Sequence, residues 1–160
     1  MTEDLGEIYK AYANSVYNYL VSLTQEKDLA EELTQEVFYR AVYSIGAYDG
    51  SCKLKVWLFQ IAKHVWYQEL AKRKKRAFQE LHESIPSPNR TPEEETLLRS
   101  SKMDLYRAIH QLGEPMREIV HMRISGECSF AEIGEIFGKS ETWARVTFYR
   151  AKQKLAEVLT

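Results

Sequence analysis

The stretch from Ser129 to Lys154 constrains the fold most, because it predicts two short helices joined by a tight turn. Ser129 is a good N-cap residue, and Glu132 follows three residues later, where its side chain can close a capping box. Gly138 stands where the first helix must end in a left-handed residue, and Ser140 can cap the next helix. Two helices with a short glycine-containing turn are typical of the helix-turn-helix motif, whose second helix lies in the DNA major groove.

The second helix of this motif is predicted to bury one face and to expose a basic one. Its inward positions are spaced by four, three and four residues and are Ala144, Phe148, Ala151 and Leu155. Its outward positions are Thr142, Arg145, Thr147, Tyr149, Arg150 and Lys152. This basic outward face predicts contact with nucleic acid.

The rest of the chain also carries helical periodicity, and no alternating strand pattern of useful length occurs. Apolar residues keep a helical period over 5–23, 30–41 and 54–65, and the third of these helices is expected to run to about residue 75. The stretch 43–53 contains Gly46, Asp49 and Gly50 and is predicted to be a loop. Helical patterns resume over 98–112, and another helix starts near Pro115.

The composition changes between residues 77 and 96, where Pro86, Pro88 and Pro92 interrupt any helix and few apolar residues remain. This segment is predicted to be a linker that proline stiffens locally, and a helix is expected to start at Pro92. We therefore predict an all-α protein with two small helical domains, 1–76 and 97–160. The linker 77–96 joins them, and the C-terminal domain carries the helix-turn-helix.

Composition argues against several classes of protein. No run of eighteen apolar residues exists, and the N-terminal residues lack the basic start and apolar stretch of a signal peptide. Cys52 and Cys128 form no CxxC pair, which fits a reducing cytosol, and the four histidines show no zinc-ligand spacing. The sequence therefore predicts a cytoplasmic protein with no metal site, and we assign no catalytic residue and no cofactor to it.

The net charge of −1 hides a strong segregation of charge. Residues 26–36 hold five acids and one lysine, residues 72–76 are all basic, and residues 139–154 are basic apart from Glu141. Such segregation predicts two kinds of partner, which are nucleic acid for the basic parts and a basic protein surface for the acidic part. For any one run, a merely solvated face is the alternative.

Three segments carry a resemblance to a known family. Residues 30–38, AEELTQEVF, resemble the region 2.2 signature of bacterial extracytoplasmic-function sigma factors. Residues 57–63, WLFQIAK, with the basic helix end that follows, resemble their regions 2.3 and 2.4. Residues 112–120 and 129–154 resemble their region 4. The resemblance covers almost the whole chain, with a linker in the right place.

The resemblance implies a transcription initiation factor that does no bond chemistry and takes no small-molecule substrate. Its acidic helix is expected to dock on the clamp of the largest RNA polymerase subunit, through Asp28, Glu31, Glu32, Gln35 and Glu36. The flap of the second-largest subunit, promoter DNA and an anti-sigma factor are further expected partners. Contact with a membrane is expected only indirectly, through the anti-sigma factor.

The first domain is expected to melt the minus-ten element and to hold an unpaired base near the loop before Trp57. The minus-ten residues implied are Tyr48, Asp49, Gly50, Ser51, Lys53, Lys63, His64, Tyr67, Lys72 and Arg73. Stacking of a base on an aromatic ring contributes roughly 1–3 kcal/mol, and basic side chains suit phosphates. His64 and Gln68 stand where asparagine and aspartate are frequent in the family, so an unusual minus-ten specificity is expected.

The recognition helix is expected to read the minus-thirty-five element. The residues implied are Ser140, Glu141, Thr142, Trp143, Arg145, Val146, Thr147, Tyr149 and Arg150. Arginine can contact guanine bidentately, and threonine methyl groups can contact thymine. Thr147 stands where arginine is common, so the preferred element is expected to differ from the family's usual one. For Trp66 and Trp143, packing and DNA contact are both open.

Two other functions compete with this interpretation. A stand-alone helix-turn-helix regulator would use its N-terminal half as a sensor or dimerisation domain, but it would not need an acidic region 2.2-like helix. An enzyme using Cys52 or Cys128 with a histidine is the third hypothesis, although nothing in the sequence places a base near either thiol.

Overall fold

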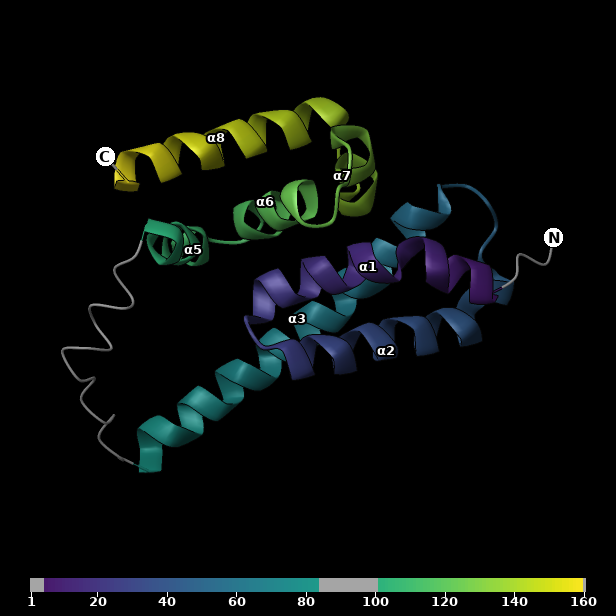
Figure 1. Cartoon of the computed structure of the whole chain (residues 1–160), viewed down its shortest axis with the longest axis horizontal. Helices are drawn as coiled ribbons and strands as arrows, with labels where there is room; N and C mark the ends of the chain where they lie inside the picture. Colours follow the sequence, from purple (N-terminus) through teal and green to yellow (C-terminus); the bar gives the residue numbers. More distant parts are fainter. Residues whose placement is uncertain (1–4, 84–100, 160) are drawn as a thin grey trace.

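The computed structural model describes residues 5–83 and 101–159, and every regular element within these ranges is helical (Figure 1). We call residues 5–83 the first half; it contains α1 (Leu5–Thr24), α2 (Lys27–Ser44), the short η1 (Ile45–Ala47) and α3 (Leu54–Glu83). The second half, 101–159, contains α5 (Ser101–Gln111), α6 (Met116–Ile124), α7 (Phe130–Phe137) and α8 (Glu141–Leu159). The predicted all-α class is confirmed. Within the described ranges, no helix has the length and apolarity needed to cross a membrane.

Helix α3 is longer than the sequence pattern predicted. It continues through Glu83, so residues 77–83 of the predicted linker are helical, and the helix does not end near residue 75 as expected. Residues such as Ala77, Gln79 and Glu80 are good helix formers, and the first proline comes only at Pro86. The remainder of the predicted linker and the helix start at Pro92 lie outside the described residues.

The first half is built from three helices whose apolar faces meet. Helix α1 contributes Val16, Tyr19, Leu20 and Leu23 to the core, α2 contributes Ala30 and Val37, and α3 contributes Val56, Phe59, Ala62, Val65 and Trp66. The predicted loop is shorter than expected, because Tyr43 and Ser44 end α2 and residues 45–47 form η1. The predicted helical periodicity of α1, α2 and α3 is thereby confirmed.

The helix-turn-helix is also confirmed, down to its caps. Both hydrogen bonds of the capping box between Ser129 and Glu132 are present, and Gly138 adopts a left-handed conformation with φ 68°. Helices α7 and α8 approach closely because Gly134 has no side chain. A Cβ at Gly134 would lie 2.8 Å from the carbonyl carbon and oxygen of Ser140. Behind the motif, α5 and α6 pack on α8 through Ile109, Leu112, Val120 and Ala151.

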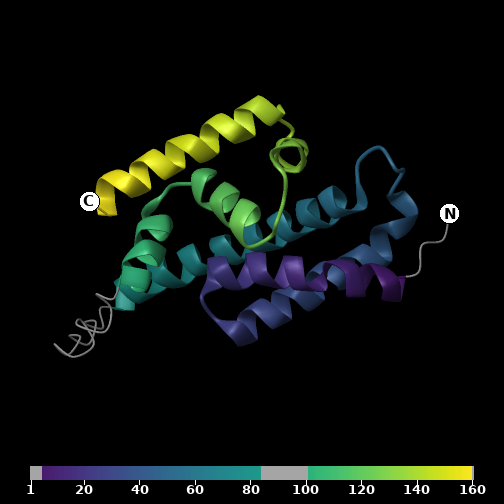
Figure 2. The ribbon, with the colours of Figure 1, turned by 45° about the horizontal axis from the view of Figure 1, so that its top comes forward.

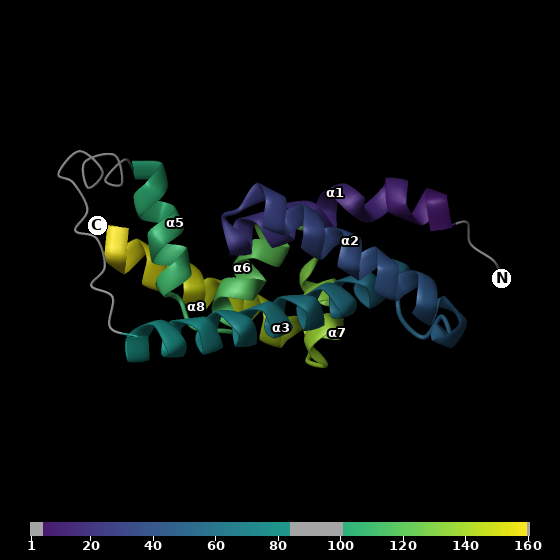
Figure 3. The ribbon, with the colours of Figure 1, turned by 90° about the horizontal axis from the view of Figure 1, so that it is seen from below.

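The two halves pack against each other and share one core. The cluster that holds Tyr19 and Phe59 of the first half also holds Ile119, Met122 and Ile133 of the second. Helix α6 packs against α1, and α7 packs across α3 (Figure 2). The C-terminal part of α3, which carries the basic run 72–76, extends beyond α1 and α2 (Figure 3).

Candidate functional site

The acidic face of α2 points to solvent in the folded chain. We use this name for the five predicted docking residues, of which Asp28, Glu31, Glu32 and Gln35 are exposed. Glu36 is half-buried, and its carboxylate lies 2.8 Å from Nε of Arg40. The opposite side of the helix is buried through Ala30, Thr34, Val37 and Ala41. The helix is therefore anchored by one side and presents its carboxylates on the other.

The loop before α3 is held by its own hydrogen bonds. The Tyr48 ring packs at a tilt against Trp57 with ring centroids 5.1 Å apart, and its hydroxyl donates to the carbonyl oxygen of Cys52. The Asp49 carboxylate accepts a hydrogen bond from the Ser51 backbone N–H at 2.9 Å. Hydrogen bonding from the Ser51 side chain, together with this backbone bond, lowers the pKa of Asp49. Gly50 has φ 77°, a conformation that glycine adopts without strain. Asp49, Gly50 and Ser51 are exposed at the tip.

Several predicted minus-ten residues of the first half contact the second half. The Lys53 ammonium lies 4.0 Å from the Glu132 carboxylate, and Nζ of Lys63 lies 4.3 Å from the centroid of the Phe137 ring. The Tyr67 hydroxyl donates to Oε2 of Glu118 at 2.7 Å. His64 and Lys72 are exposed. Among the predicted residues of α3, Lys63 and Tyr67 therefore contact α7 and α6, whereas His64 and Lys72 remain open to solvent.

Arg73 and Trp66 belong to the packing of the first half. The Arg73 guanidinium lies 3.5 Å from the carboxylates of both Glu26 and Glu69, and it also lies over the Trp66 ring. Trp66 is completely buried. Of the two alternatives open for Trp66, packing and DNA contact, packing is therefore confirmed. Because a second arginine, Arg117 of α6, lies over the same ring, Trp66 lies between the two halves.

Helix α8 presents most of its predicted reading residues to solvent. Ser140 caps it by accepting the Trp143 N–H at 3.0 Å, and Glu141 forms a 2.9 Å ion pair with Arg145. The remaining exposed members are Thr142, Val146, Tyr149 and Arg150. Trp143 is half-buried against Phe137, with ring centroids 5.5 Å apart. Such an exposed basic helix, rigidly held by a helix-turn-helix, suits a DNA groove.

Thr147 does not lie on the outward face, and that prediction is wrong. It is only 8% exposed, and its hydroxyl donates to the Trp143 carbonyl oxygen at 2.7 Å. The position lies three residues after Ala144 and four before Ala151, both fully buried, so the inward stripe includes it.

Sequence reasoning missed a buried polar cluster between the halves. Glu118 of α6 is fully buried, and besides Tyr67 it accepts a 3.4 Å hydrogen bond from Tyr19 of α1. Burial raises the pKa of Glu118 to about 8, and the neighbouring Glu114 carboxylate acts in the same direction, so the carboxyl is largely neutral at pH 7. Tyr19 and Glu118 are 99 residues apart, and no periodic pattern signals such a pair.

The two thiols and the buried His121 have shifted pKa values. Burial raises the pKa of Cys52, and it raises that of Cys128 to about 12, which disfavours the reactive thiolate in both. Burial lowers the pKa of His121 to about 3, so this ring is neutral. In residues 5–83 and 101–159, no three His, Cys, Asp or Glu side chains form a group that could hold a metal ion.

Comparison with known sequences gives matches to both halves. Residues 8–76 match the family described as sigma-70 region 2, and residues 102–155 match sigma-70, region 4. The chain is 32% identical over 161 residues to the ECF RNA polymerase sigma factor SigM of Bacillus subtilis, covering 94% of this chain and 92% of that protein. It is 26% identical to the RNA polymerase sigma factor YlaC of the same organism, covering 99% and 93%.

Solved structures of similar fold span the whole chain. The sigma factor RpoE of Bartonella quintana, crystallised with the anti-sigma factor NepR, matches with a TM-score of 0.74 at 22% identity, covering 99% of this chain and 98% of that one. CnrH, in complex with the cytosolic domain of CnrY, matches with a TM-score of 0.69 at 18% identity, covering 97% and 86%. At these identities the likeness concerns the fold.

Proposed function

This chain belongs to the extracytoplasmic-function RNA polymerase sigma factors of the sigma-70 family. From that membership we propose which of its surfaces bind the polymerase and which bind promoter DNA. As a sigma factor it directs core RNA polymerase to specific promoters and initiates transcription. The stand-alone regulator is not favoured, because the family match includes region 2 as well as region 4. Sigma factors are non-catalytic initiation factors, and we assign the bond chemistry wholly to the polymerase.

The acidic face of α2 is our proposed docking site for the clamp of the largest polymerase subunit. The observation that carries the proposal is that its carboxylates are exposed while the helix is anchored from behind. Exposed ion pairs contribute roughly 0–1 kcal/mol each, so tight docking also needs apolar contact. We expect the flap of the second-largest subunit to meet the second half.

That apolar contact is available further along α2. Tyr39 and Tyr43 are 59% and 75% exposed, with ring centroids 4.8 Å apart, and Val42 lies between them in sequence and is also exposed. Positions 28, 32, 35, 39 and 42 advance by four, three, four and three residues, all of them exposed. This is the spacing with which one helix packs lengthwise on another. We therefore assign Tyr39, Val42 and Tyr43 to the docking site together with the acidic face.

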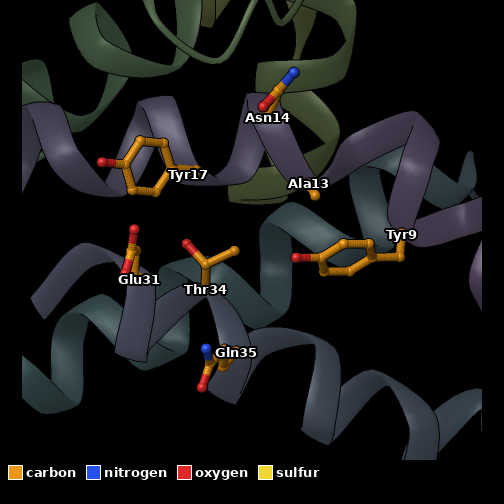
Figure 4. Close-up of a pocket in the computed structure, with 7 residues that line it drawn as sticks. All are labelled: Tyr9, Ala13, Asn14, Tyr17, Glu31, Thr34 and Gln35. Carbon is orange, nitrogen blue, oxygen red and sulfur yellow. The ribbon is translucent and has the colours of Figure 1, made fainter. Parts of the chain in front are cut away.

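A pocket of about 330 Å³ lies beside the acidic face, between α1 and α2 (Figure 4). Its lining includes Tyr9 and Tyr17 of α1 and Glu31 and Thr34 of α2 (Figure 4). Two aromatic rings with one carboxylate suit a long basic side chain, because the rings attract a cation and the carboxylate pairs with it. We propose that the pocket takes a lysine or arginine of the clamp.

Charge reversal tests the docking site. Replacing Glu31→Lys together with Glu32→Lys should weaken binding to core polymerase on the order of tenfold or more, because two attractive contacts become repulsive. Co-elution with purified core polymerase measures this. Glu7→Lys with Glu80→Lys, two exposed acids elsewhere in the first half, is the matched control. If both double variants bind the core equally well, the docking site is wrongly placed.

The tyrosines allow a separate test of the apolar part. Tyr39→Ala with Tyr43→Ala should cost about 1–3 kcal/mol of core binding if these rings are buried at the interface. Phe78→Ala, at another ring that is 60% exposed, should leave binding unchanged. If the tyrosine variant binds the core as well as the parent chain does, the tyrosines are not part of the docking site.

The DNA surfaces and the inhibitor complete the proposal. We assign minus-thirty-five reading to the exposed residues of α8, and minus-ten capture to the loop tip and to the lysines and Tyr67 along α3. Because a sigma factor of the same fold, RpoE, forms a complex with an anti-sigma factor, we propose an anti-sigma partner for this chain as well. The setting is the cytoplasm, with any membrane link only through that partner.

Run-off transcription tests the function as a whole. Purified core polymerase with a randomised promoter pool should yield sequence-selective transcripts only when the chain is added. A footprint on duplex DNA by the chain alone, with no effect on the core, would instead favour the stand-alone regulator.

A further inference from the structure

The Arg145 guanidinium on the outer face of α8 is held by two groups. Its Nη2 lies 2.9 Å from Oε1 of Glu141, which stands one turn earlier on the same helix. Its Cζ lies 5.5 Å from the centroid of the Phe130 ring, which belongs to α7. The Arg145 side chain is nevertheless 46% exposed. These contacts therefore hold the guanidinium without hiding it, and its remaining N–H donors can still meet a ligand.

The Phe130 ring is a fixed platform for this guanidinium. Phe130 is the first residue of α7, directly after the N-cap Ser129, so the capping box determines where the ring stands. Phe148 of α8 packs against it with ring centroids 5.5 Å apart. Figure 1 shows α7 lying at the start of α8, where Gly134 lets the two helices approach closely. The rigid helix-turn-helix thus carries the half-buried ring to the edge of the recognition helix.

A second guanidinium lies over the same ring. Arg123, near the end of α6, places its Cζ 4.2 Å from the centroid of Phe130, and its Nη1 donates to the Cys128 carbonyl oxygen at 3.2 Å. Arg123 and Arg145 repel each other, and the electron-rich face of the ring offsets part of this repulsion. The two arginines together place positive charge beside the first turns of α8, where a DNA strand would raise the local concentration of counter-charge.

Arg150 lies on the same exposed face of α8 and shows a contrast. In the part of the chain that the structure describes, it has neither an ion pair nor a ring contact. A free arginine gives up its rotamer freedom when it binds, whereas Arg145 is largely ordered beforehand. A phosphate can be approached from many directions, but a guanine edge accepts two N–H groups in a single plane. An ordered guanidinium therefore suits a base, and a free one suits a phosphate.

We propose that Phe130 and Glu141 are positioning residues, which direct the Arg145 guanidinium at a guanine of the minus-thirty-five element. Phe130 lies outside the set of residues that the sequence implies for this element. Glu141 belongs to that set, but it acts on DNA through Arg145 and does not itself read a base. This inference rests on the proposed function, because it deepens the assignment of α8 to minus-thirty-five reading. The alternative is that the ring only fills space and that the ion pair is an ordinary solvated helical pair.

Selection by the holoenzyme from a promoter pool with a randomised minus-thirty-five element tests these roles. Comparison of the parent chain with Arg145→Ala first identifies the base pair that Arg145 reads. Phe130→Leu should lower the preference for guanine at that base pair about two- to fivefold, because it removes the ring but keeps an apolar side chain. Phe130→Tyr, which keeps the ring, should retain the parent preference. Phe137→Leu removes a ring that packs on Trp143 at the other end of α7, and should leave the preference at that base pair unchanged.

Three results would overturn the role of the ring. The first is an unchanged guanine preference in Phe130→Leu, and the second is an equal loss of preference in Phe130→Tyr. The third is a loss spread evenly over all positions of the element, because this would mean a general loosening of the helix-turn-helix. Thermal unfolding of each variant before selection establishes that it is folded.

Glu141→Gln gives a second readout that does not depend on core packing, since Glu141 is exposed. Loss of this carboxylate reduces repulsion of DNA phosphates, so binding summed over all sequences should not fall. The guanine preference at the Arg145 base pair should nevertheless decrease about twofold, because the guanidinium loses one of its two supports. A residue with a merely structural role would not separate these two quantities. Weaker binding to all sequences with an unchanged preference would show that Glu141 does not position Arg145.

Failure of this inference is distinguishable from failure of the proposed function. If the parent holoenzyme selects no minus-thirty-five sequence at all, the assignment of α8 to that element is wrong. If the parent holoenzyme selects one, but Arg145→Ala weakens binding to every sequence equally, Arg145 contacts a phosphate. In that case the positioning roles of Phe130 and Glu141 are overturned while the proposed function stands.

Discussion

The two surfaces assigned to DNA differ in how the folded chain presents them. On α8 the exposed Arg145, Tyr149 and Arg150 face solvent, whereas on α3 the cation of Lys63 lies on Phe137 and the Tyr67 hydroxyl is bound by Glu118. The first surface is exposed to a duplex, whereas in the second Lys63 and Tyr67 contact the second half while His64 and Lys72 stay exposed. Reading of double-stranded DNA and capture of a melted strand therefore need not occur in the same conformation.

Helix α7 contacts both of the helices that carry the surfaces assigned to DNA. Its Phe137 touches Lys63 on one side and Trp143 of α8 on the other, and its Glu132 both closes the capping box and approaches Lys55. The helix that positions the recognition helix is thus the same one that covers α3. A change in α7 should disturb both surfaces, whereas changes on the outer face of α8 should disturb only one.

The largest effect is expected for Gly134→Ala. The added Cβ would meet backbone atoms of Lys139 and Ser140 at 2.8–2.9 Å, which cannot move aside without separating α7 from α8. We expect a loss of about 3 kcal/mol in the free energy of unfolding, together with loss of minus-thirty-five binding. Chemical denaturation measures the first effect. Gly46→Ala is the matched control, because its Cβ would meet nothing within 4 Å. Equal stability of the two variants would contradict the close approach.

A smaller, purely local effect is expected for Arg145→Ala. Its ion pair with Glu141 is exposed and contributes little to stability, so the fold should be unchanged. Promoter binding by the holoenzyme should weaken by about 1–3 kcal/mol with relaxed preference at one base pair. Selection from a randomised minus-thirty-five library measures this. A loss that is uniform over all sequences would make Arg145 a phosphate contact.

The smallest effect is expected for Thr147→Val. The variant keeps the shape but loses the buried hydrogen bond to the Trp143 carbonyl oxygen, which costs about 1 kcal/mol of stability. The preferred minus-thirty-five sequence should not change. Thr142→Val, on the exposed face of the same helix, should leave stability unchanged and should change the preferred minus-thirty-five sequence. A shifted sequence preference in the Thr147 variant would restore this residue to the DNA surface.

Local features of this fold were predictable, and contacts between distant segments were not. The capping box of Ser129 and Glu132 and the left-handed Gly138 depend on neighbouring residues only, so the sequence indicated them correctly. Thr147 was misplaced because a helical stripe has width, and a polar residue on its margin can satisfy its hydroxyl within the helix. The extension of α3 past residue 76 was missed because charge and composition changed there before helix propensity did.

The site was predictable to a similar degree. The exposed acids of α2 follow from helical spacing, since the buried positions of that helix are apolar or small. The covering of α3 by the second half depends on Glu118 meeting Tyr19 and Tyr67, and these residues are 99 and 51 positions away from it. Trp66 was undecided for the same reason, since its burial depends on Arg73 and Arg117 from two different halves.

The most direct test of the covered surface is a distance between the halves, measured with and without the polymerase. Spin labels at Glu80→Cys and Lys139→Cys, both exposed positions outside the assigned surfaces, report it by pulsed electron resonance once Cys52→Ser and Cys128→Ala remove the native thiols. The free chain should give one narrow distance distribution, and the complex with core polymerase and promoter DNA a clearly shifted one. The same distribution in both states would contradict a closed free form that opens to reach the minus-ten strand.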